Sequence, residues 1–140
     1  MAARPREAGR RELAVERVAS LRSHDAWLAA LRAGDAEQLA SRYAPAALVA
    51  MRHPITADIV CLEGRDAVAG YYRELLSDTT VLAVDVVTRL VDRWFVFSEL
   101  AVRLAHADAC EVVAKLADVC VLTRDDAIAV HLGTSAGPAA

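Results

Sequence analysis

The spacing of apolar residues changes along the chain, and the change predicts two kinds of structure. Up to about residue 77, apolar side chains recur every three to four positions, as on a helix that buries one face. From residue 80 to residue 132 the period is two, and turns recur about every dozen residues, which is typical of antiparallel strands. The sequence therefore predicts an α+β fold in which helices cover one face of a curved antiparallel sheet.

Cap and turn residues give these elements approximate bounds. The first helix is expected over residues 9–33, where Gly34 ends it. Asp35 begins a short second helix that Pro45 ends, and the third helix covers residues 64–77. The expected strands are residues 46–52, 81–91, 94–104, 110–122 and 127–132, with residues 55–63 either irregular or a hairpin arm.

Both faces of the predicted sheet are apolar. Phe95 and Phe97 alternate with Val96 and Leu100, so neither face of this strand is polar. The helices can cover one face, and an antiparallel sheet with a second apolar face needs another cover. The pattern therefore predicts a homodimer through the outer sheet face, with a pocket between the helices and the inner face.

One carboxylate interrupts the apolar strand at residues 116–122. Asp118 is costly to bury in its ionised form, so it either has a partner or is held neutral by desolvation. Such perturbed groups are concentrated at functional sites, which makes Asp118 the first candidate for the pocket. The alternative is that Asp118 bonds a loop backbone or lies at the rim in water.

The composition sets the size of the domain and excludes several functions. At 140 residues the chain is expected to form one domain, residues 1–140, with flexible tails at 1–7 and 133–140. A net charge of −3 argues against a nucleic-acid partner. The first twelve residues are basic and lack the apolar core of a signal peptide, and no apolar run reaches roughly 18 residues, so we expect a cytoplasmic protein without a membrane partner.

The cysteines and histidines do not predict a metal or a cofactor. The three cysteines lack metal or redox spacing, and the four histidines lack ligand spacing. The chain has no phosphate-binding loop and no dinucleotide fingerprint. Any chemistry is therefore expected to use side chains alone.

Four segments in the same order resemble a known superfamily. Residues 30–35, 42–47, 64–76 and 117–128 are similar to the nuclear transport factor 2-like superfamily, in its SnoaL-like and ketosteroid-isomerase-like branch. The chain also resembles the SgcJ-type members found in enediyne antibiotic clusters. The resemblance implies a cone-shaped (cystatin-like) fold with a pocket for a hydrophobic small molecule.

The resemblance also implies roles for individual residues. Asp118 matches the Asp that donates a hydrogen bond to the oxyanion in ketosteroid isomerase, an acid kept neutral by its site. Tyr43 and Tyr72 match tyrosines that line and support that pocket. Trp27 replaces the isomerase's oxyanion Tyr and keeps an N–H donor. His53, before a proline, stands where the isomerase has its Asp base.

The last two strands supply a second candidate base. A turn centred on residues 124–125 places Asp118 opposite His131, near the position where SnoaL cyclases have an acid/base Asp. A carboxylate beside an imidazole fixes its tautomer and raises its basicity. The predicted catalytic residues are Asp118, His131 and His53. The predicted pocket lining is Trp27, Tyr43, Met51, Tyr72, Trp94 and Leu100.

Each of these residues also has an ordinary structural explanation. His131 could lie at a strand end in solvent, and His53 could belong to a surface turn. Trp27, Tyr43 and Tyr72 could be core aromatics.

The expected function is that of a SnoaL-like pocket protein. It would act on or bind a hydrophobic polyketide-type intermediate of antibiotic biosynthesis. The chemistry would be cofactor-independent acid/base chemistry such as isomerisation, cyclisation or dehydration. The alternatives are a ligand-binding protein without catalysis and a dimeric assembly module of the same fold.

Overall fold

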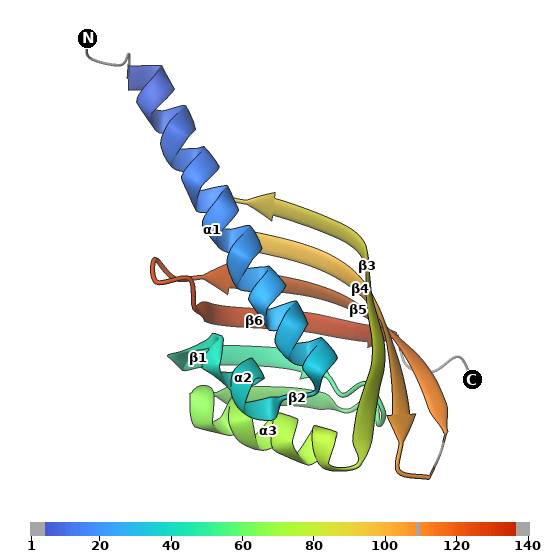
Figure 1. Cartoon of the computed structure of the whole chain (residues 1–140). Coiled ribbons are helices and arrows are strands. Elements are labelled where there is room, and N and C mark those ends of the chain that lie inside the picture. Colours follow the sequence, from blue (N-terminus) through green and yellow to red (C-terminus); the bar gives the residue numbers. More distant parts are fainter. Residues whose placement is uncertain (1–4, 109, 137–140) are drawn as a thin grey trace.

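The computed structural model describes residues 5–108 and 110–136 of the chain. Within these residues, three helices pack against a six-stranded curved sheet, which confirms the predicted α+β, cone-shaped fold (Figure 1). The helices are α1 (Pro5–Ala33), α2 (Ala36–Ser41) and α3 (Arg65–Ser77). The strands are β1 (Tyr43–Arg52), β2 (Ile59–Glu63), β3 (Thr79–Asp92), β4 (Phe95–His106), β5 (Glu111–Leu122) and β6 (Ile128–Ala136).

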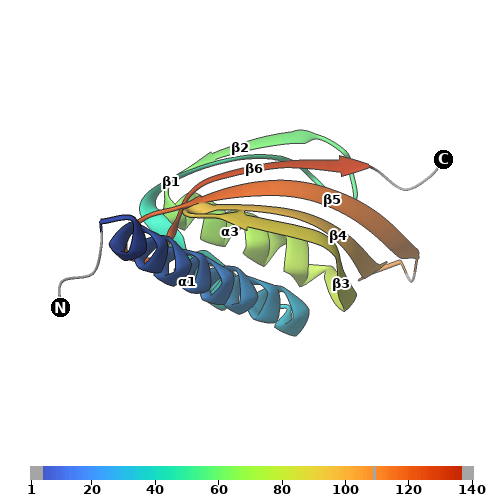
Figure 2. The same ribbon diagram turned by 90° about the horizontal axis from the view of Figure 1, so that it is seen from above.

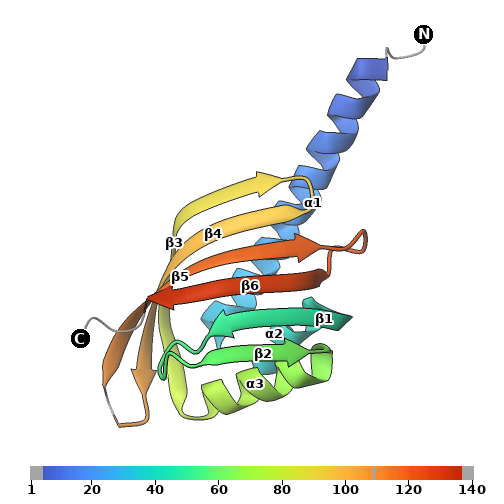
Figure 3. The same ribbon diagram turned by 180° about the vertical axis from the view of Figure 1, so that it is seen from behind.

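The strand order is β2-β1-β6-β5-β4-β3, so the sheet is not a simple meander (Figure 3). β3 to β6 follow one another antiparallel as predicted, but β6 pairs with β1 in parallel. The prediction of an entirely antiparallel sheet is therefore wrong at this one pairing. Its consequence is that β6 lies in the middle of the sheet, where Val49 of β1 pairs with His131.

The helices all cover the same face of the sheet. Figure 2 shows the strands arching over α1 and α3, and Figure 3 shows the opposite face without a helix on it. The core lies in the hollow between the two layers, where Leu28, Leu39 and Val68 are fully buried. The concave face is therefore enclosed by the chain itself, and the convex face is not.

The helix ends follow the predicted caps. α1 ends at Ala33, and Gly34 adopts a φ of +63°, which a residue without a Cβ tolerates. The Asp35 side chain accepts a hydrogen bond from the backbone N–H of Gln38 at 3.0 Å. α2 stops at Ser41 and not at Pro45, because the chain enters β1 at residue 43.

The apolar spacing on α1 predicts an inner face of Val18, Leu21, Leu28 and Leu31, of which Leu28 and Leu31 are buried. Ser20, His24, Trp27 and Leu31 face the core, whereas Val18 is 48 % exposed. The reason is that the N-terminal part of α1 extends past the sheet and has no layer to pack on (Figure 1).

The predicted tails also differ. α1 begins at Pro5 and β6 continues to Ala136, so residues 5–7 are helical and 133–136 are strand. The rest of both predicted tails, residues 1–4 and 137–140, lies outside the described residues.

Candidate functional site

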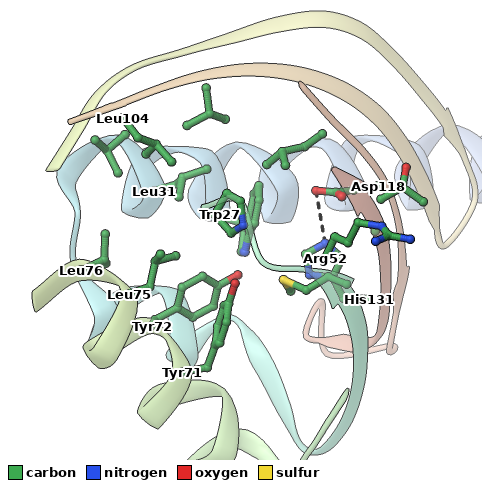
Figure 4. Close-up of a pocket in the computed structure, with 17 residues that line it drawn as sticks. Trp27, Leu31, Arg52, Tyr71, Tyr72, Leu75, Leu76, Leu104, Asp118 and His131 are labelled. Carbon is green, nitrogen blue, oxygen red and sulfur yellow. Dashed lines mark ion pairs between the residues drawn. The ribbon is translucent and has the colours of Figure 1, made fainter. Parts of the chain in front are cut away.

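A cavity of about 50 Å³ lies between α1, α3 and the concave face of the sheet (Figure 4). Its wall is apolar apart from a few polar groups, chiefly Asp118, His131, Arg52 and two tyrosine hydroxyls. The residues that line it are Trp27, Leu31, Met51, Arg52, Pro54, Tyr71, Tyr72, Leu75, Leu76, Val81, Val102, Leu104, Leu116, Asp118, His131, Gly133 and Thr134.

Asp118 occupies the middle of the concave face. Its neighbours in register are Ser98 on β4 and Gly133 on β6, and it is 5 % exposed. A Cβ atom at position 133 would overlap the Oδ1 atom of Asp118. The absence of a side chain at Gly133 therefore leaves the space that the carboxylate fills.

The side chain of His131, on β6, contacts that of Asp118 on the adjacent strand β5. The Nε2 atom of His131 lies 3.3 Å from the Oδ2 atom of Asp118, and the imidazole is 2 % exposed. The contact does not have hydrogen-bond geometry, so Nε2 has no well-directed partner among residues 5–108 and 110–136. The pair is thus in contact, buried and not fully satisfied.

The predicted register of these two strands is wrong by two positions. Asp118 pairs with Gly133 and His131 pairs with Cys120, because the connection between β5 and β6 is longer and a bulge follows Val121. The two side chains still meet, since both lie on the concave face as diagonal neighbours.

A hydrogen-bond chain holds the other side of the imidazole. The Tyr43 hydroxyl lies 2.8 Å from His131 Nδ1 and 3.0 Å from the Tyr72 hydroxyl. Trp27 Nε1, which can only donate, donates to the same oxygen at 3.2 Å. Tyr43 has one proton to give, so it donates either to Nδ1 or to Tyr72.

These two arrangements give the site two states. When Tyr43 donates to Nδ1, a neutral His131 carries its proton on Nε2 and presents it to the Asp118 carboxylate. When Nδ1 donates to Tyr43, two cases are possible. Either His131 is neutral and Nε2 faces a protonated Asp118 as the acceptor, or His131 is an imidazolium beside the Asp118 carboxylate. The network therefore couples the position of one proton to the direction of a chain of hydroxyls.

Burial keeps the nearby hydroxyls protonated. Desolvation raises the pKa of Tyr43 and of Tyr72 well above the usual value for tyrosine. Burial, and then the charge of Asp118, raises the pKa of Tyr71 to about 12. All three side chains are therefore hydrogen-bond donors at neutral pH.

Trp27 lies between two histidines. Its ring stacks on His24 with centroids 5.9 Å apart and meets His131 edge-on at 5.6 Å. Burial, followed by the charge of Arg89, lowers the pKa of His24 to about 4. His24 is therefore a neutral wall behind Trp27 at physiological pH.

The structure brings most of the predicted site residues together. Trp27, Met51, Tyr72, Asp118 and His131 all line the cavity. Of the others, Tyr43 and Leu100 are buried behind the lining and do not reach the cavity surface. Tyr43 supports the cavity wall through its hydrogen bonds to Trp27, Tyr72 and His131.

Two predicted site residues lie elsewhere. Trp94, predicted to line the pocket, lies in the turn between β3 and β4, where it is 39 % exposed. His53 follows β1 and does not line the cavity. Its Nδ1 atom accepts the backbone N–H groups of Ile55 and Thr56, each at 3.1 Å, so this nitrogen is used to hold a turn.

Sequence reasoning missed four residues at the site. Tyr71 and Arg52 line the cavity, Gly133 makes room for Asp118, and Ser98 lies opposite Asp118 with a buried hydroxyl that has no partner among the described residues. The alternation with Val96 would have placed Ser98 on the inner face. The position of Gly133 depends on strand register, and Arg52 lies at the end of β1, where the following loop is not fixed by the pattern. For Tyr71, the helical period does not show that it reaches the cavity together with Tyr72.

Neither a metal site nor a membrane helix is found in the described part of the chain. Residues 5–108 and 110–136 contain no group of three or more His, Cys, Asp or Glu side chains that could hold a metal ion. No helix among these residues is both long and apolar enough to cross a membrane.

Comparisons with known proteins agree with this architecture. The family described as SnoaL-like domain matches residues 24–131. A comparison with curated proteins gives no match. None of the matches specifically supports the resemblance to SgcJ-type proteins.

Solved structures share the fold at low sequence identity. An LEH-like epoxide hydrolase from M. tuberculosis is 16 % identical, with a TM-score of 0.69 over 86 % of this chain and 84 % of that one. The epoxide hydrolase/cyclase-like enzyme SalBIII, described with a role in pyran ring formation in the polyether salinomycin, is 16 % identical, with a TM-score of 0.67 over 83 % and 89 %. A protein of ketosteroid isomerase-like fold from Catenulispora acidiphila, solved with trimethylamine, is 16 % identical, with a TM-score of 0.68 over 79 % and 82 %.

Proposed function

Because the chain belongs to the SnoaL-like domain family, we propose that its cavity binds a hydrophobic small molecule and that Asp118 and His131 move a proton on it. The observation that carries the proposal is the buried Asp–His pair at an apolar cavity, with one imidazole nitrogen facing the carboxylate without a well-directed hydrogen bond. Acid/base pairs in water-poor, concave sites are typical of proton-transfer enzymes.

Stability does not explain this pair. Two ionisable side chains that are 5 % and 2 % exposed lose their hydration, and a contact that is not a directed hydrogen bond returns little of that loss. Apolar side chains at the same positions would make a more stable core. The pair is therefore better explained by chemistry than by folding.

The surrounding residues suit the pair for moving a proton. Tyr43 fixes the Nδ1 side of His131, so Nε2 is directed to Asp118 and the cavity. A proton taken from a carbon atom beside a carbonyl group resides on the pair. Exchange results when a solvent deuteron replaces it before the same carbon is reprotonated, and isomerisation results when it returns to a second carbon of an unsaturated enolate; no cofactor is consumed. Cyclisation and dehydration would also need a proton acceptor and a proton donor at this position.

The size of the cavity limits what enters it. About 50 Å³ is far below the roughly 300–1,000 Å³ of pockets for drug-sized ligands. We therefore propose that the cavity takes a small ring, or one ring of a larger hydrophobic molecule. We propose that this molecule is a polyketide-type intermediate of antibiotic biosynthesis. The role of SalBIII in pyran ring formation in the polyether salinomycin supports this type of pathway.

Exchange of the α-hydrogens of cyclopentanone in D₂O tests the proposal. The protein should accelerate the exchange over buffer, as followed by NMR. His131→Asn keeps a group near the position of Nδ1 and removes Nε2, so it should lower the rate at least tenfold. His106→Ala, which changes a histidine at the end of β4 that does not line the cavity, is the matched control.

The possible results separate the proposal from its alternative. An exchange rate equal to that of buffer, with cyclopentanone bound, would leave a ligand-binding protein without catalysis. An unchanged rate in His131→Asn would remove the pair from the mechanism.

A second candidate function rests on the convex face of the sheet. Two neighbouring rows of apolar residues cross it in register, one from β3 to β1 and the other from β4 to β1. They are Leu90, Phe97, Val119, Leu132 and Ala50 in one row and Phe95, Val121, Val130 and Leu48 in the other. We propose that a second copy of the chain covers this face, as a homodimer or assembly module would require.

A further inference from the structure

We propose that Tyr71 recognises the ligand by donating a hydrogen bond to a carbonyl oxygen atom, so that the ligand class is small neutral ketones. This inference rests on the proposed function, because it names the partner of the same cavity. It adds a recognition residue that is separate from the Asp–His pair.

The first observation is an unpaired donor in an apolar wall. The Tyr71 hydroxyl is buried, lines the cavity and has no hydrogen-bond partner in the described part of the chain. A buried hydroxyl without a partner costs free energy, which a ligand oxygen in the cavity would recover.

The second observation is the contrast with the adjacent tyrosine. Tyr72, the next residue on α3, also lines the cavity, but its hydroxyl is already paired, 3.0 Å from that of Tyr43. Tyr71 lies edge-on to Tyr72 with ring centroids 5.2 Å apart, and edge-on to His53 at 5.9 Å. These contacts fix the Tyr71 ring while leaving its hydroxyl free for the ligand.

The third observation is the position of Tyr71 relative to the pair. Tyr71 comes from the helical wall of the cavity, whereas Asp118 and His131 come from the sheet (Figure 4). A ligand that fills the space between them has its oxygen at α3 and its carbon skeleton toward the pair. That orientation brings a carbon atom beside a carbonyl group to the groups that move protons.

Charge narrows the ligand class further. The raised pKa keeps the Tyr71 hydroxyl protonated, so it donates at physiological pH. An anionic ligand would face the Asp118 carboxylate in an apolar cavity, which penalises it. Arg52, the cation in the lining, offsets little of this because it is exposed and donates to the Ala57 carbonyl at 3.0 Å. A hydrocarbon would leave the hydroxyl unpaired, so a neutral molecule with an oxygen acceptor fits best.

Two ligands of the same shape test the inference. Cyclopentanone has the oxygen, and methylenecyclopentane replaces it with a CH₂ group. In calorimetric titrations, Tyr71→Phe should raise the Kd of cyclopentanone roughly five- to tenfold and change that of methylenecyclopentane less than twofold. Leu76→Ala, which removes part of the apolar lining and no hydroxyl, should weaken the binding of both ligands by the same factor.

A spectroscopic measurement reports the hydrogen bond directly. The carbonyl stretch of bound cyclopentanone should lie at lower frequency in the wild-type protein than in Tyr71→Phe. Equal frequencies would overturn the inference, and so would an equal loss of affinity for both ligands, which indicates a packing role. If the wild-type protein binds neither ligand, the proposed function fails with it. If it binds both and Tyr71→Phe changes neither Kd, the inference alone fails.

Discussion

The concave face of the sheet buries polar side chains, and the convex face exposes apolar ones. Selection for stability alone would favour the reverse. On β6, His131 is 2 % exposed on the concave face, and the next residue, Leu132, is 51 % exposed on the convex face. The concave face buries Asp118 and Ser98, while the convex face leaves Phe95 half exposed. Buried polar groups and exposed apolar groups are the informative exceptions in a protein, and here each face has one kind.

The difference teaches that the faces are built for different partners. A concave face with an acid/base pair suits a small molecule, and a convex face with apolar rows suits a large flat surface. If this division is right, substitutions on one face should leave the function of the other unchanged. The predictions below test that separation, beginning with the largest effect.

Removing the carboxylate should have the largest effect. Asp118→Asn keeps the shape of the side chain, but an amide can neither carry the carboxylate charge nor give up an acidic proton. The exchange of the α-hydrogens of cyclopentanone should therefore slow by about 10²–10⁴-fold. Since the two residues act as a unit, the double variant with His131→Asn should be little slower than the slower single variant. Asp125→Asn, in the exposed β5–β6 loop, is the control. Rate losses that simply multiply would show that the two residues act independently.

The concave face should also make stability depend on pH through His24. Its pKa is lowered from 6.5 to about 4, so the unfolded chain binds a proton more readily than the folded one between these values. Stability from this group is complete above pH 6.5 and falls as the pH decreases toward 4, by on the order of 3 kcal/mol in all and about 2 kcal/mol by pH 5.

Urea unfolding at pH 7.5 and 5.0 measures this effect. The wild-type protein should lose more stability than His24→Phe over the interval, because the variant has no imidazole to protonate. Equal losses in the two proteins would show that His24 is not buried in the neutral form.

Filling the space at Gly133 should disturb the pair by an intermediate amount. Gly133→Ala places a methyl group against the Asp118 carboxylate, so we expect a loss of about 1–3 kcal/mol of stability and slower exchange. Gly70→Ala is the matched control, because nothing lies within 4 Å of the added Cβ and the residue is in α3. That change should stabilise the helix by roughly 0.5–1 kcal/mol. Identical behaviour of the two variants would contradict the close approach at Gly133.

A charge on the convex face should have the smallest effect on chemistry and a clear one on assembly. Leu132→Asp should weaken self-association roughly tenfold or more in sedimentation experiments, while the exchange rate per subunit stays the same. Val18→Asp, an exposed apolar residue on α1, is the control. A wild-type protein that sediments as a monomer at high concentration would refute the proposed second copy.

The sequence predicted the fold because its signals are local. The caps Gly34 and Asp35 and the alternation around Val96 each depend on a few neighbouring residues, and the structure has helices or a strand where they predict them. The parallel pairing of β1 with β6 was missed because pairing between distant strands leaves no pattern in either strand.

The site was predictable only in part for the same reason. Asp118 stands out as a charge in an apolar strand, but its contact with His131 depends on a register that the loop length sets. Trp94 was misplaced because an aromatic residue at a strand end has the same pattern whether it faces the core or forms the turn. Tyr71 and Tyr72 are adjacent, and the helical period could not show that both reach the cavity.

The central position of β6 has a consequence for how the molecule folds. The hairpin of β1 and β2 and the sheet of β3, β4 and β5 share no strand pairing until β6 inserts between them. The hydrogen bond between Tyr43 and His131 joins residues 88 positions apart. Closing a loop of this length lowers the conformational entropy of the chain before the contacts it allows can form. Because Asp118 lies on β5 and His131 on β6, while Tyr43, which holds His131, lies on β1, the cavity wall is complete only when β6 joins the two parts.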